Sequence, residues 1–274
     1  LSAGLGVQKE LTEERIYDRF RNRIMFPIAD PQGNVIGFGG RTLGEDAKYI
    51  NSPDGPLYSK SLALFGTHGA REDARERKSV ILVEGYFDVL AFHHIGIRNV
   101  VAVSGTALTE QHVTLLKRIA PEVLLCLDQD EAGRQAAERA FALCARQGLS
   151  VNTLTLPAGK DPDECAAIAP EDMRKRCDEG GVPYLDALRS TLKEAKVEKR
   201  DILQRFLPLL AAIPSAVERE EELRKTAAIL GTTITALTDD LQSWERSLRS
   251  KQEMSQRKVD APFTSTELLF GLLL

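Results

Sequence analysis

Between residues 79 and 156, four short apolar runs alternate with three longer segments that carry apolar residues at helical spacing. Apolar runs of this length predict strands that are buried on both faces, as in a parallel sheet. Strands that alternate with helices form right-handed β-α-β units, so this stretch predicts an α/β fold around a parallel sheet. The predicted order is strand 80–83, helix 86–95, strand 99–103, helix 109–119 capped by Thr109, strand 123–127, helix 131–147 and strand 151–156.

The first 78 residues are mixed in character and predict a small α/β subdomain rich in basic residues. Two strand-like runs, at 24–28 and 35–40, flank the turn signal Asp30-Pro-Gln-Gly33. Sequence rich in loops follows from Tyr49 onward.

After about residue 165 the strand patterns stop. Apolar spacing predicts a helical bundle with helices at 184–195, 199–213, 217–230 and 232–246. The sequence then becomes polar, and an apolar helix without a partner begins near Thr266, so we expect the natural chain to continue. The predicted organisation is therefore 1–78, 79–165, 166–248 and 249–274.

The composition limits the classes of function. The chain is 43% hydrophobic and 28% charged, and no apolar run approaches the roughly 18 residues of a membrane span, so we expect no membrane contact. Its four cysteines are scattered and its adjacent histidines are not spaced for one metal, which predicts reduced core thiols, no zinc site and a cytoplasmic location. With a net charge of −4, binding of nucleic acid would require a local basic patch.

Acidic residues follow three of the four predicted strands and recur one helical turn into the first helix. The carboxyl ends of parallel strands meet at one edge of a sheet, where α/β proteins bind their ligands. We therefore expect these side chains to converge. The residues are Glu84, Asp88, Asp128, Asp130, Asp161 and Asp163.

Converging carboxylates repel one another, by roughly 4 kcal/mol for two unit charges about 4 Å apart at an effective dielectric of 20. A counter-ion would relieve this repulsion, and hard oxygen ligands favour Mg²⁺ or Mn²⁺. Such an ion commonly engages phosphate oxygens, which predicts phosphoryl transfer, nucleotidyl transfer or nuclease chemistry. A P-loop ATPase is disfavoured because its motif is absent from the sequence. The alternative is that each acid only solvates a loop or a helix N-terminus.

Basic residues crowd one short stretch near the start of the chain, at Arg15, Arg19, Arg21 and Arg23. On an extended strand, the last three would share one face. The alternative is a solvated charged face with no partner. Further basic residues follow in the loop-rich region, at Arg41, Lys48 and Lys60.

Three blocks closely resemble the motifs of a TOPRIM domain, the metal-binding domain shared by primases, topoisomerases and some nucleases: Val83-Glu-Gly-Tyr-Phe-Asp88, Asp128-Gln-Asp-Glu-Ala-Gly-Arg134 and Lys160-Asp-Pro-Asp163. Three earlier blocks are similar to the RNA polymerase core of bacterial DnaG-type primases: Tyr17-Asp-Arg-Phe-Arg-Asn-Arg-Ile-Met-Phe-Pro-Ile28, Val35-Ile-Gly-Phe-Gly-Gly-Arg41 and Lys48-Tyr-Ile-Asn-Ser-Pro53. The blocks occur in the family's order and cover nearly the whole chain. Only the earlier blocks separate a primase from other TOPRIM proteins.

The resemblance implies a DNA primase core that makes short RNA primers for replication from ribonucleoside triphosphates on a single-stranded DNA template. The implied catalytic residues are Glu84, Asp128 and Asp130, with Glu84 also a candidate general acid or base. The implied site for Mg²⁺ or Mn²⁺ adds Asp88, Asp161 and Asp163. The implied template and nucleotide contacts are Arg19, Arg21, Arg23, Arg41, Lys48, Asn51 and Lys60.

The sequence departs from the family's pattern at Gln129, where a small residue is usual, and at Phe87, where methionine is common. From the resemblance we expect this sequence to lack the family's zinc-binding domain and to include only the start of its helicase-binding domain, near Thr266. We therefore expect the replicative helicase to bind through the missing domain, within the bacterial replisome. The rival interpretations are a topoisomerase, which needs a tyrosine nucleophile in a separate large domain, and a non-catalytic TOPRIM module, which has no use for the full acidic set.

Overall fold

The structure, a computed structural model, describes residues 4–8, 16–44, 47–157, 159, 161–195 and 197–259. Arg15, Lys160 and the apolar helix expected from Thr266 lie outside these ranges. Within them, no helix is both long and apolar enough to cross a membrane. The chain divides into two compact units: Leu1–Glu194 with Ala212–Pro214, and Ala195–Ala211 with Ser215–Leu274.

The first unit is built on a sheet of β6 (Ser79–Val83), β7 (Val100–Ala102), β8 (Glu122–Leu125), β9 (Ser150–Thr153) and β10 (Val182–Pro183). The strand order is β10-β9-β8-β6-β7. Strands β6 to β9 are parallel, which confirms the prediction, and β10 pairs antiparallel with β9 at one edge. Every residue of β6 is buried, which explains its unbroken apolar sequence.

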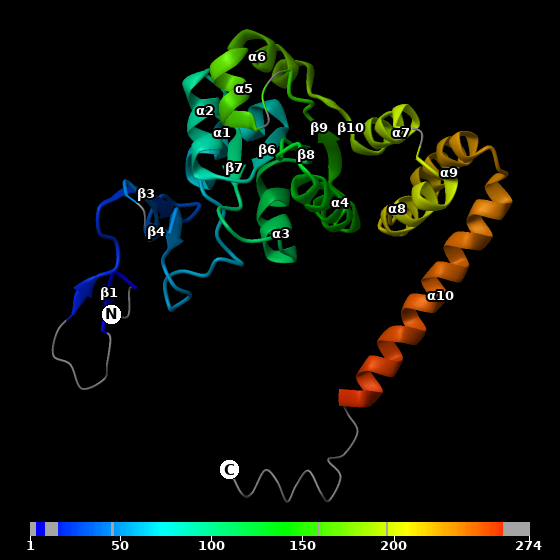
Figure 1. The fold of residues 1–274 in the computed structure, drawn as a ribbon, viewed down its shortest axis with the longest axis horizontal. Coiled ribbons are helices and arrows are strands. Elements are labelled where there is room, and N and C mark those ends of the chain that lie inside the picture. The colour runs from blue at the N-terminus through cyan, green and yellow to red at the C-terminus, as the bar shows by residue number, and fades with distance from the viewer. Residues whose placement is uncertain are drawn as a thin grey trace, which may run out of the picture. The chain divides into compact units, whose positions relative to one another are not determined.

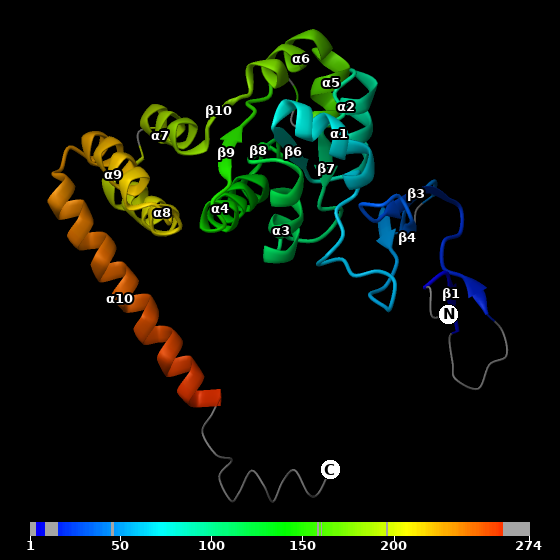
Figure 2. The same cartoon turned by 180° about the vertical axis from the view of Figure 1, so that it is seen from behind.

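The helices of this unit are α1 (Thr67–Arg77), α2 (Tyr86–His94), α3 (Glu110–Ile119), α4 (Glu131–Arg146), α5 (Pro162–Ile168), α6 (Pro170–Glu179) and α7 (Tyr184–Glu194). Helices α2, α5 and α6 cover one face of the sheet, and α3 and α4 cover the other (Figures 1 and 2). Thr109 caps α3 as predicted, because its Oγ1 accepts a hydrogen bond from the backbone N of His112 at 3.1 Å. With both faces covered, the loops at the strand ends are left to form a site.

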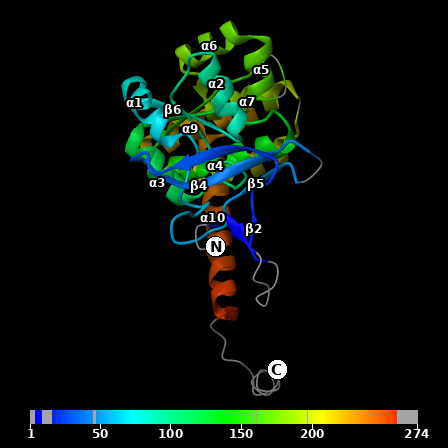
Figure 3. The same ribbon diagram turned by 90° about the vertical axis from the view of Figure 1, so that its left-hand side faces the viewer.

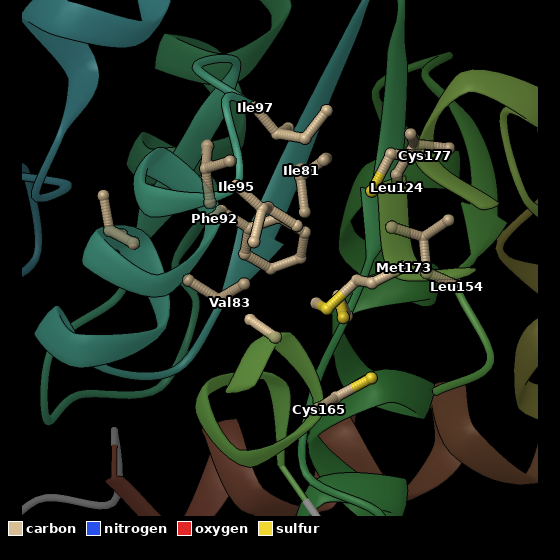
Figure 4. Packing of buried hydrophobic residues seen from close by; sticks show 14 of the residues in the cluster. Ile81, Val83, Phe92, Ile95, Ile97, Leu124, Leu154, Cys165, Met173 and Cys177 are labelled. Carbon is tan, nitrogen blue, oxygen red and sulfur yellow. The ribbon is translucent and has the colours of Figure 1, made fainter. Parts of the chain in front are cut away.

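Figure 4 shows the core between β6 and the helices α2, α5 and α6. Ile81 and Val83 of β6 lie beside Phe92 of α2, and Met173 of α6 packs in the same cluster. The alternate residues of β6 point to the opposite face of the sheet. The cysteines are free and buried, as predicted: Cys126, Cys144, Cys165 and Cys177.

Two small antiparallel sheets precede the central one. They comprise β1 (Gly6–Val7) with β2 (Tyr17–Asp18), and β3 (Arg23–Ala29), β4 (Val35–Thr42) and β5 (Tyr49–Asn51) in that order. Strands β3 and β4 run side by side in Figure 3. Buried Phe26 of β3 stacks on Tyr86 at the start of α2, with ring centroids 4.6 Å apart. This contact fixes the β3–β5 sheet beside the turn that carries Glu84.

The second unit consists of α8 (Lys199–Ala211), α9 (Ala216–Leu230) and α10 (Ile234–Val259), which pack against one another. Phe206 and Leu210 of α8 are fully buried, as their spacing predicts. Thr233 directly precedes α10 and caps it, because its Oγ1 accepts a hydrogen bond from Ala236 N at 3.2 Å. This helix continues past 246, its predicted end, because the Lys, Gln, Glu and Arg residues that follow are good helix formers. The prediction stopped at 246 because these residues show no apolar period.

The structure contains helices that the sequence pattern does not predict, namely α1, α5 and α6. It also extends the first unit to Glu194, beyond residue 165, where the predicted metal-binding domain ends. The reason is that Met173 and Cys177 of α6 pack in the core of this unit and β10 extends its sheet. Helix α7 therefore belongs with the sheet, not with the predicted bundle.

Candidate functional site

A cavity of about 870 Å³ is lined by residues that follow β6, β7, β8 and β9, together with residues of β4 and β5. Its acidic lining residues are Glu84, Asp88, Asp128, Asp161 and Asp163. Its basic lining residues are Arg19, Arg41, Lys48 and Lys60. The cavity thus brings together most of the site residues predicted from the sequence; those that do not line it are Asp130, Arg21 and Arg23.

The acidic turn, which we define as Glu84–Asp88, joins β6 to α2. Asp88 Oδ2 accepts a hydrogen bond from the backbone N of Gly85 at 2.7 Å, so the carboxylate closes the first turn of the helix. Gly85 has an extended φ of −119°, so the turn does not need a conformation reserved for glycine. Space is restricted there instead, because a Cβ at Gly85 would lie 3.3 Å from Asp88 Oδ2.

The two acids after β8, Asp128 and Asp130, have different surroundings, although the sequence predicts that both converge on one site. Asp128 lines the cavity, and its backbone N donates a hydrogen bond to Glu84 Oε1 at 3.3 Å. Asp130 is the N-cap of α4, and its Oδ1 accepts a hydrogen bond from Gly133 N at 2.8 Å. The Asp130 carboxylate is held at the helix and not at the cavity, because the first backbone N–H groups of α4 have no acceptor within the helix.

Burial, with repulsion between neighbouring carboxylates, raises the pKa of three acids that line this cavity, Asp88, Asp128 and Asp163. Burial raises the pKa of Asp88 to about 7, with neighbouring carboxylates adding to the effect. Burial, followed by the charge of Glu84, raises the pKa of Asp128 to about 6. The pKa of Asp163 is also raised, chiefly by burial, while Arg41 opposes the shift. A bound cation would stabilise the ionised forms of all three.

Among the described residues, no three His, Cys, Asp or Glu side chains lie close enough together to hold a metal ion between them. The acids therefore share a cavity without forming a closed coordination cage. Asp161 also serves its own helix, because its Oδ1 accepts a hydrogen bond from Glu164 N at 2.8 Å and caps α5.

The basic wall, which we define as Arg41, Lys48 and Lys60, lines the same cavity. The Arg41 guanidinium lies 4.4 Å from the ring centroid of Phe87 and 5.7 Å from that of Tyr49. Such cation–π contacts hold the charge beside the acidic turn, since Phe87 belongs to that turn. Phe87, a departure from the family's pattern, thus has a defined place in the site.

The arginines at 19, 21 and 23 do not share one face of a strand, in contrast to the prediction. Strand β3 begins only at Arg23, and Asn22 before it has a left-handed φ of 51°. Arg19 is partly buried and lines the cavity, whereas Arg21 is exposed. Arg23 Nη1 donates to two backbone carbonyls, in β4 and in the loop after it, at 3.3 and 2.8 Å. Arg23 thus supports the β3–β5 sheet.

Two parts of the cavity lining are not predicted from the sequence. One is Tyr49, whose ring faces Arg41, and the other is the loop 104–107 after β7. The rule that located the acids, that ligands bind beyond the carboxyl ends of parallel strands, also applies to this loop. Its residues are uncharged, so they did not stand out in the sequence.

Gly133 in α4 offers a test of how tightly the turn at Asp128 is held. A Cβ at Gly133 would lie 2.0 Å from the backbone O of Asp128, so Gly133→Ala must shift this turn. We expect the substitution to destabilise the fold by roughly 1–3 kcal/mol and to reduce activity about tenfold or more. Urea unfolding and a nucleotide-incorporation assay measure the two effects. The control is Gly69→Ala in α1, where a Cβ would meet no heavy atom within 4 Å beyond its own stretch of helix, and alanine should stabilise the helix by about 0.5–1 kcal/mol. Equal results for the two variants would contradict the expectation.

The two parts of the chain that contribute residues to the cavity each match a known protein family. Residues 1–71 match the family described as "DNA primase catalytic core, N-terminal domain", and residues 81–166 match the family described as "Toprim-like". A DNA primase of Pseudomonas aeruginosa is 42% identical over 224 residues, which cover 78% of this chain and 34% of that protein. The chain spans less than half the length of this and other curated relatives.

Solved structures agree with this result. The crystal structure of a DNA primase domain from Pseudomonas aeruginosa has a TM-score of 0.75 and 37% sequence identity, covering 87% of this chain and 77% of that one. The structure of the DnaG primase catalytic domain bound to ssDNA has a TM-score of 0.72 and 35% identity, covering 86% of this chain and 76% of that one. Primases with a Toprim domain are generally metal-dependent. The mixed α/β fold, the acidic cavity and these matches together establish that the chain belongs to the bacterial DnaG-type primases and corresponds to the family's catalytic core.

Proposed function

We propose that this chain synthesises short RNA primers on single-stranded DNA by metal-dependent nucleotidyl transfer. The observation that carries the proposal is one cavity that is lined both by carboxylates and by the basic wall. Polymerisation from nucleoside triphosphates needs both, since acids hold the metal and cations bind the phosphates. The relatives named DNA primase support the reaction, and the related catalytic domain bound to single-stranded DNA supports the template.

The acids of the cavity fit Mg²⁺ or Mn²⁺ in their chemistry. Mg²⁺ is usually held by one or two carboxylates, with substrate phosphates and water completing its coordination, which suits a cavity without a closed cage. When bound, the ion would activate the attacking 3′-hydroxyl and neutralise the triphosphate. We propose that zinc has no site in this part of the chain, because zinc takes three or four protein ligands and no three His, Cys, Asp or Glu side chains of the described residues gather closely enough to supply them. The residues that would hold the metal are Glu84, Asp88, Asp128, Asp161 and Asp163, with Asp130 orienting the turn of Asp128.

The side chains around the metal have distinct proposed roles. Glu84 is the candidate general base, and its contact with Asp128 N holds its carboxylate at the cavity. Arg41, supported by the rings of Phe87 and Tyr49, would bind the triphosphate together with Lys48 and Lys60.

Arg19 and Arg21 are the proposed template contacts, whereas Arg23 supports the sheet. Removing one phosphate contact reduces the salt slope of single-strand binding by roughly 0.7, so Arg19→Ala combined with Arg21→Ala should weaken binding most at low salt. Fluorescence anisotropy with a labelled oligonucleotide, over a salt series, measures this. The matched control replaces two exposed arginines outside the cavity, Arg75 and Arg118, by alanine. An unchanged slope in the first variant would mean that its arginines are only solvated.

The direct test of the function is ribonucleotide incorporation. The assay should supply a DNA template with an annealed RNA primer, because we propose that start-site selection belongs to parts of the protein beyond this chain. We expect products that require the template and Mg²⁺ or Mn²⁺ and that disappear with EDTA. Failure of the folded, metal-supplied protein to extend the primer would refute the proposal.

The proposed setting is the bacterial replisome in the cytoplasm. We propose that the replicative helicase contacts a domain beyond the described residues, so this chain alone should respond weakly to it. Comparing primer synthesis by this chain and by a full-length relative, each with its helicase, tests the point. A strong helicase response from this chain would place the partner surface within the catalytic core.

A further inference from the structure

Asn51, the last residue of β5, joins separate parts of the first unit through its side chain. Its Nδ2 donates a hydrogen bond to the backbone O of Ser104, after β7, at 2.7 Å. Its Oδ1 accepts a hydrogen bond from the hydroxyl of Tyr86, at the start of α2, also at 2.7 Å. A carbonyl can only accept, so the contact with Ser104 sets the orientation of the amide and makes the Tyr86 hydroxyl the donor.

Both partners of Asn51 belong to, or contact, the acidic turn. Tyr86 is part of that turn, between Glu84 and Asp88. The backbone N of Ser104 donates to the backbone O of Glu84 at 2.9 Å. One amide therefore restrains the acidic turn from two directions.

Tyr86 is a rigid partner for this contact. It is 2% exposed, stacks on Phe26 and meets Phe65 edge-on with ring centroids 4.8 Å apart. Gly39 of β4 leaves room for it, since a Cβ there would lie 2.3 Å from the hydroxyl oxygen. Burial raises the pKa of Tyr86, so its hydroxyl stays protonated and able to donate.

The backbone of Asn51 contacts a basic residue of the cavity lining. Arg19 Nε donates to the backbone O of Asn51 at 3.3 Å. A proposed template-binding residue and the acidic turn therefore meet at one residue of β5. These contacts are hydrogen bonds between folded segments of the chain.

We infer that Asn51 is a positioning residue that fixes the acidic turn against the template side of the cavity, and is not a nucleotide contact. The inference deepens the proposed function and rests on it. It reassigns Asn51, for which the resemblance to primases implies contact with nucleotide or nucleic acid. Direct binding of a nucleotide by the amide would compete with two short contacts to the protein.

The test is a double-mutant cycle with Tyr86→Phe and Asn51→Ala, in the nucleotide-incorporation assay. Tyr86→Phe removes one hydrogen bond and keeps the ring, so kcat should fall about fivefold, with the KM for nucleotide unchanged. Asn51→Ala removes both bonds and should lower kcat about 30-fold. The double variant should match Asn51→Ala within about twofold, because the two residues act through one contact. The controls are Tyr58→Phe, in the same aromatic cluster, and Asn34→Ala, whose amide bonds Asp30 in the β3–β4 turn.

Hydrogen exchange separates this inference from the proposed function. Asn51→Ala should speed amide exchange in residues 84–88 and 104–106 and leave the core strand β6 unchanged. If the wild-type protein makes no RNA, the proposed function fails, and the exchange result still decides whether Asn51 positions the turn. Unchanged exchange in both segments would overturn the inference. The inference would also be overturned if Asn51→Ala raised the KM for nucleotide, left kcat normal, and had an effect that multiplied with that of Tyr86→Phe in the double variant. Asn51 would then be a nucleotide contact.

Discussion

Replacing Asp128 with asparagine is expected to lower ribonucleotide incorporation about a thousandfold while the protein stays folded. Asparagine keeps the shape of the side chain and removes the charge proposed to bind the metal, a loss of about 4 kcal/mol in transition-state stabilisation. Glu84 should keep its place, because it accepts a hydrogen bond from the backbone of Asp128, which the substitution does not change. The measurement is steady-state incorporation over a Mg²⁺ titration.

Two companion variants sharpen this result. Asp130→Asn should cost much less activity, because asparagine also caps helices well and Asp130 is the N-cap of α4. Asp172→Asn, at an exposed carboxylate of α6 that does not line the cavity, should be neutral. Near-normal synthesis by Asp128→Asn at limiting Mg²⁺ would remove Asp128 from the metal site.

Replacing Asp88 with asparagine should stabilise the metal-free protein by roughly 3 kcal/mol at pH 8 and by much less at pH 4. Burial raises the pKa of Asp88 from 3.8 to about 7, so the folded protein holds this proton more tightly than the unfolded chain. The stability of the wild type therefore falls as the pH rises from about 4 to 7, and the penalty is complete above that range. Asparagine has no charge to bury, and its side-chain oxygen still accepts a hydrogen bond from Gly85 N.

Urea unfolding in EDTA, at a series of pH values, measures the effect of Asp88→Asn. The matched control is Asp172→Asn, which removes an exposed carboxylate that does not line the cavity. Adding Mg²⁺ should reverse the order, because the wild type would then gain more from the metal than the variant. An equal gain at pH 4 and pH 8 would show that the buried charge of Asp88 is not the cause.

The parallel sheet was predictable because its strands and most of its helices follow simple apolar periods. Helix α1 was not, because its buried residues, Thr67, Ala70 and Ala74, are small and lie among charged residues. Helix α5 has only seven residues, α6 is mostly polar, and each begins with a proline. Proline at the first helical position is itself a start signal, which a search for apolar periods does not use.

The acids of the site were predictable from their place after the strands, since parallel strands bring such positions to one edge. The surroundings of each side chain were not. Asp130 looks like a second metal ligand in the sequence, and only the start of α4 reveals it as a cap. Tyr86 and Ser104, the partners of Asn51, lie 35 and 53 positions away in the sequence, so no local sequence pattern predicts these contacts.

The edges of the central sheet bear on the choice of fragments for expression. At one edge, Phe65 exchanges backbone hydrogen bonds with Ala102 of β7, at 2.9 and 3.0 Å. At the other, β10 covers β9 and carries Pro183, whose missing N–H discourages a further strand. A fragment cut at residue 165 would lack β10 and the core side chains Met173 and Cys177 of α6. The edge of β9 would then be unpaired, and the core beside the sheet would contain a cavity. Such a fragment should self-associate, whereas one that ends at Glu194 keeps its own edge protected.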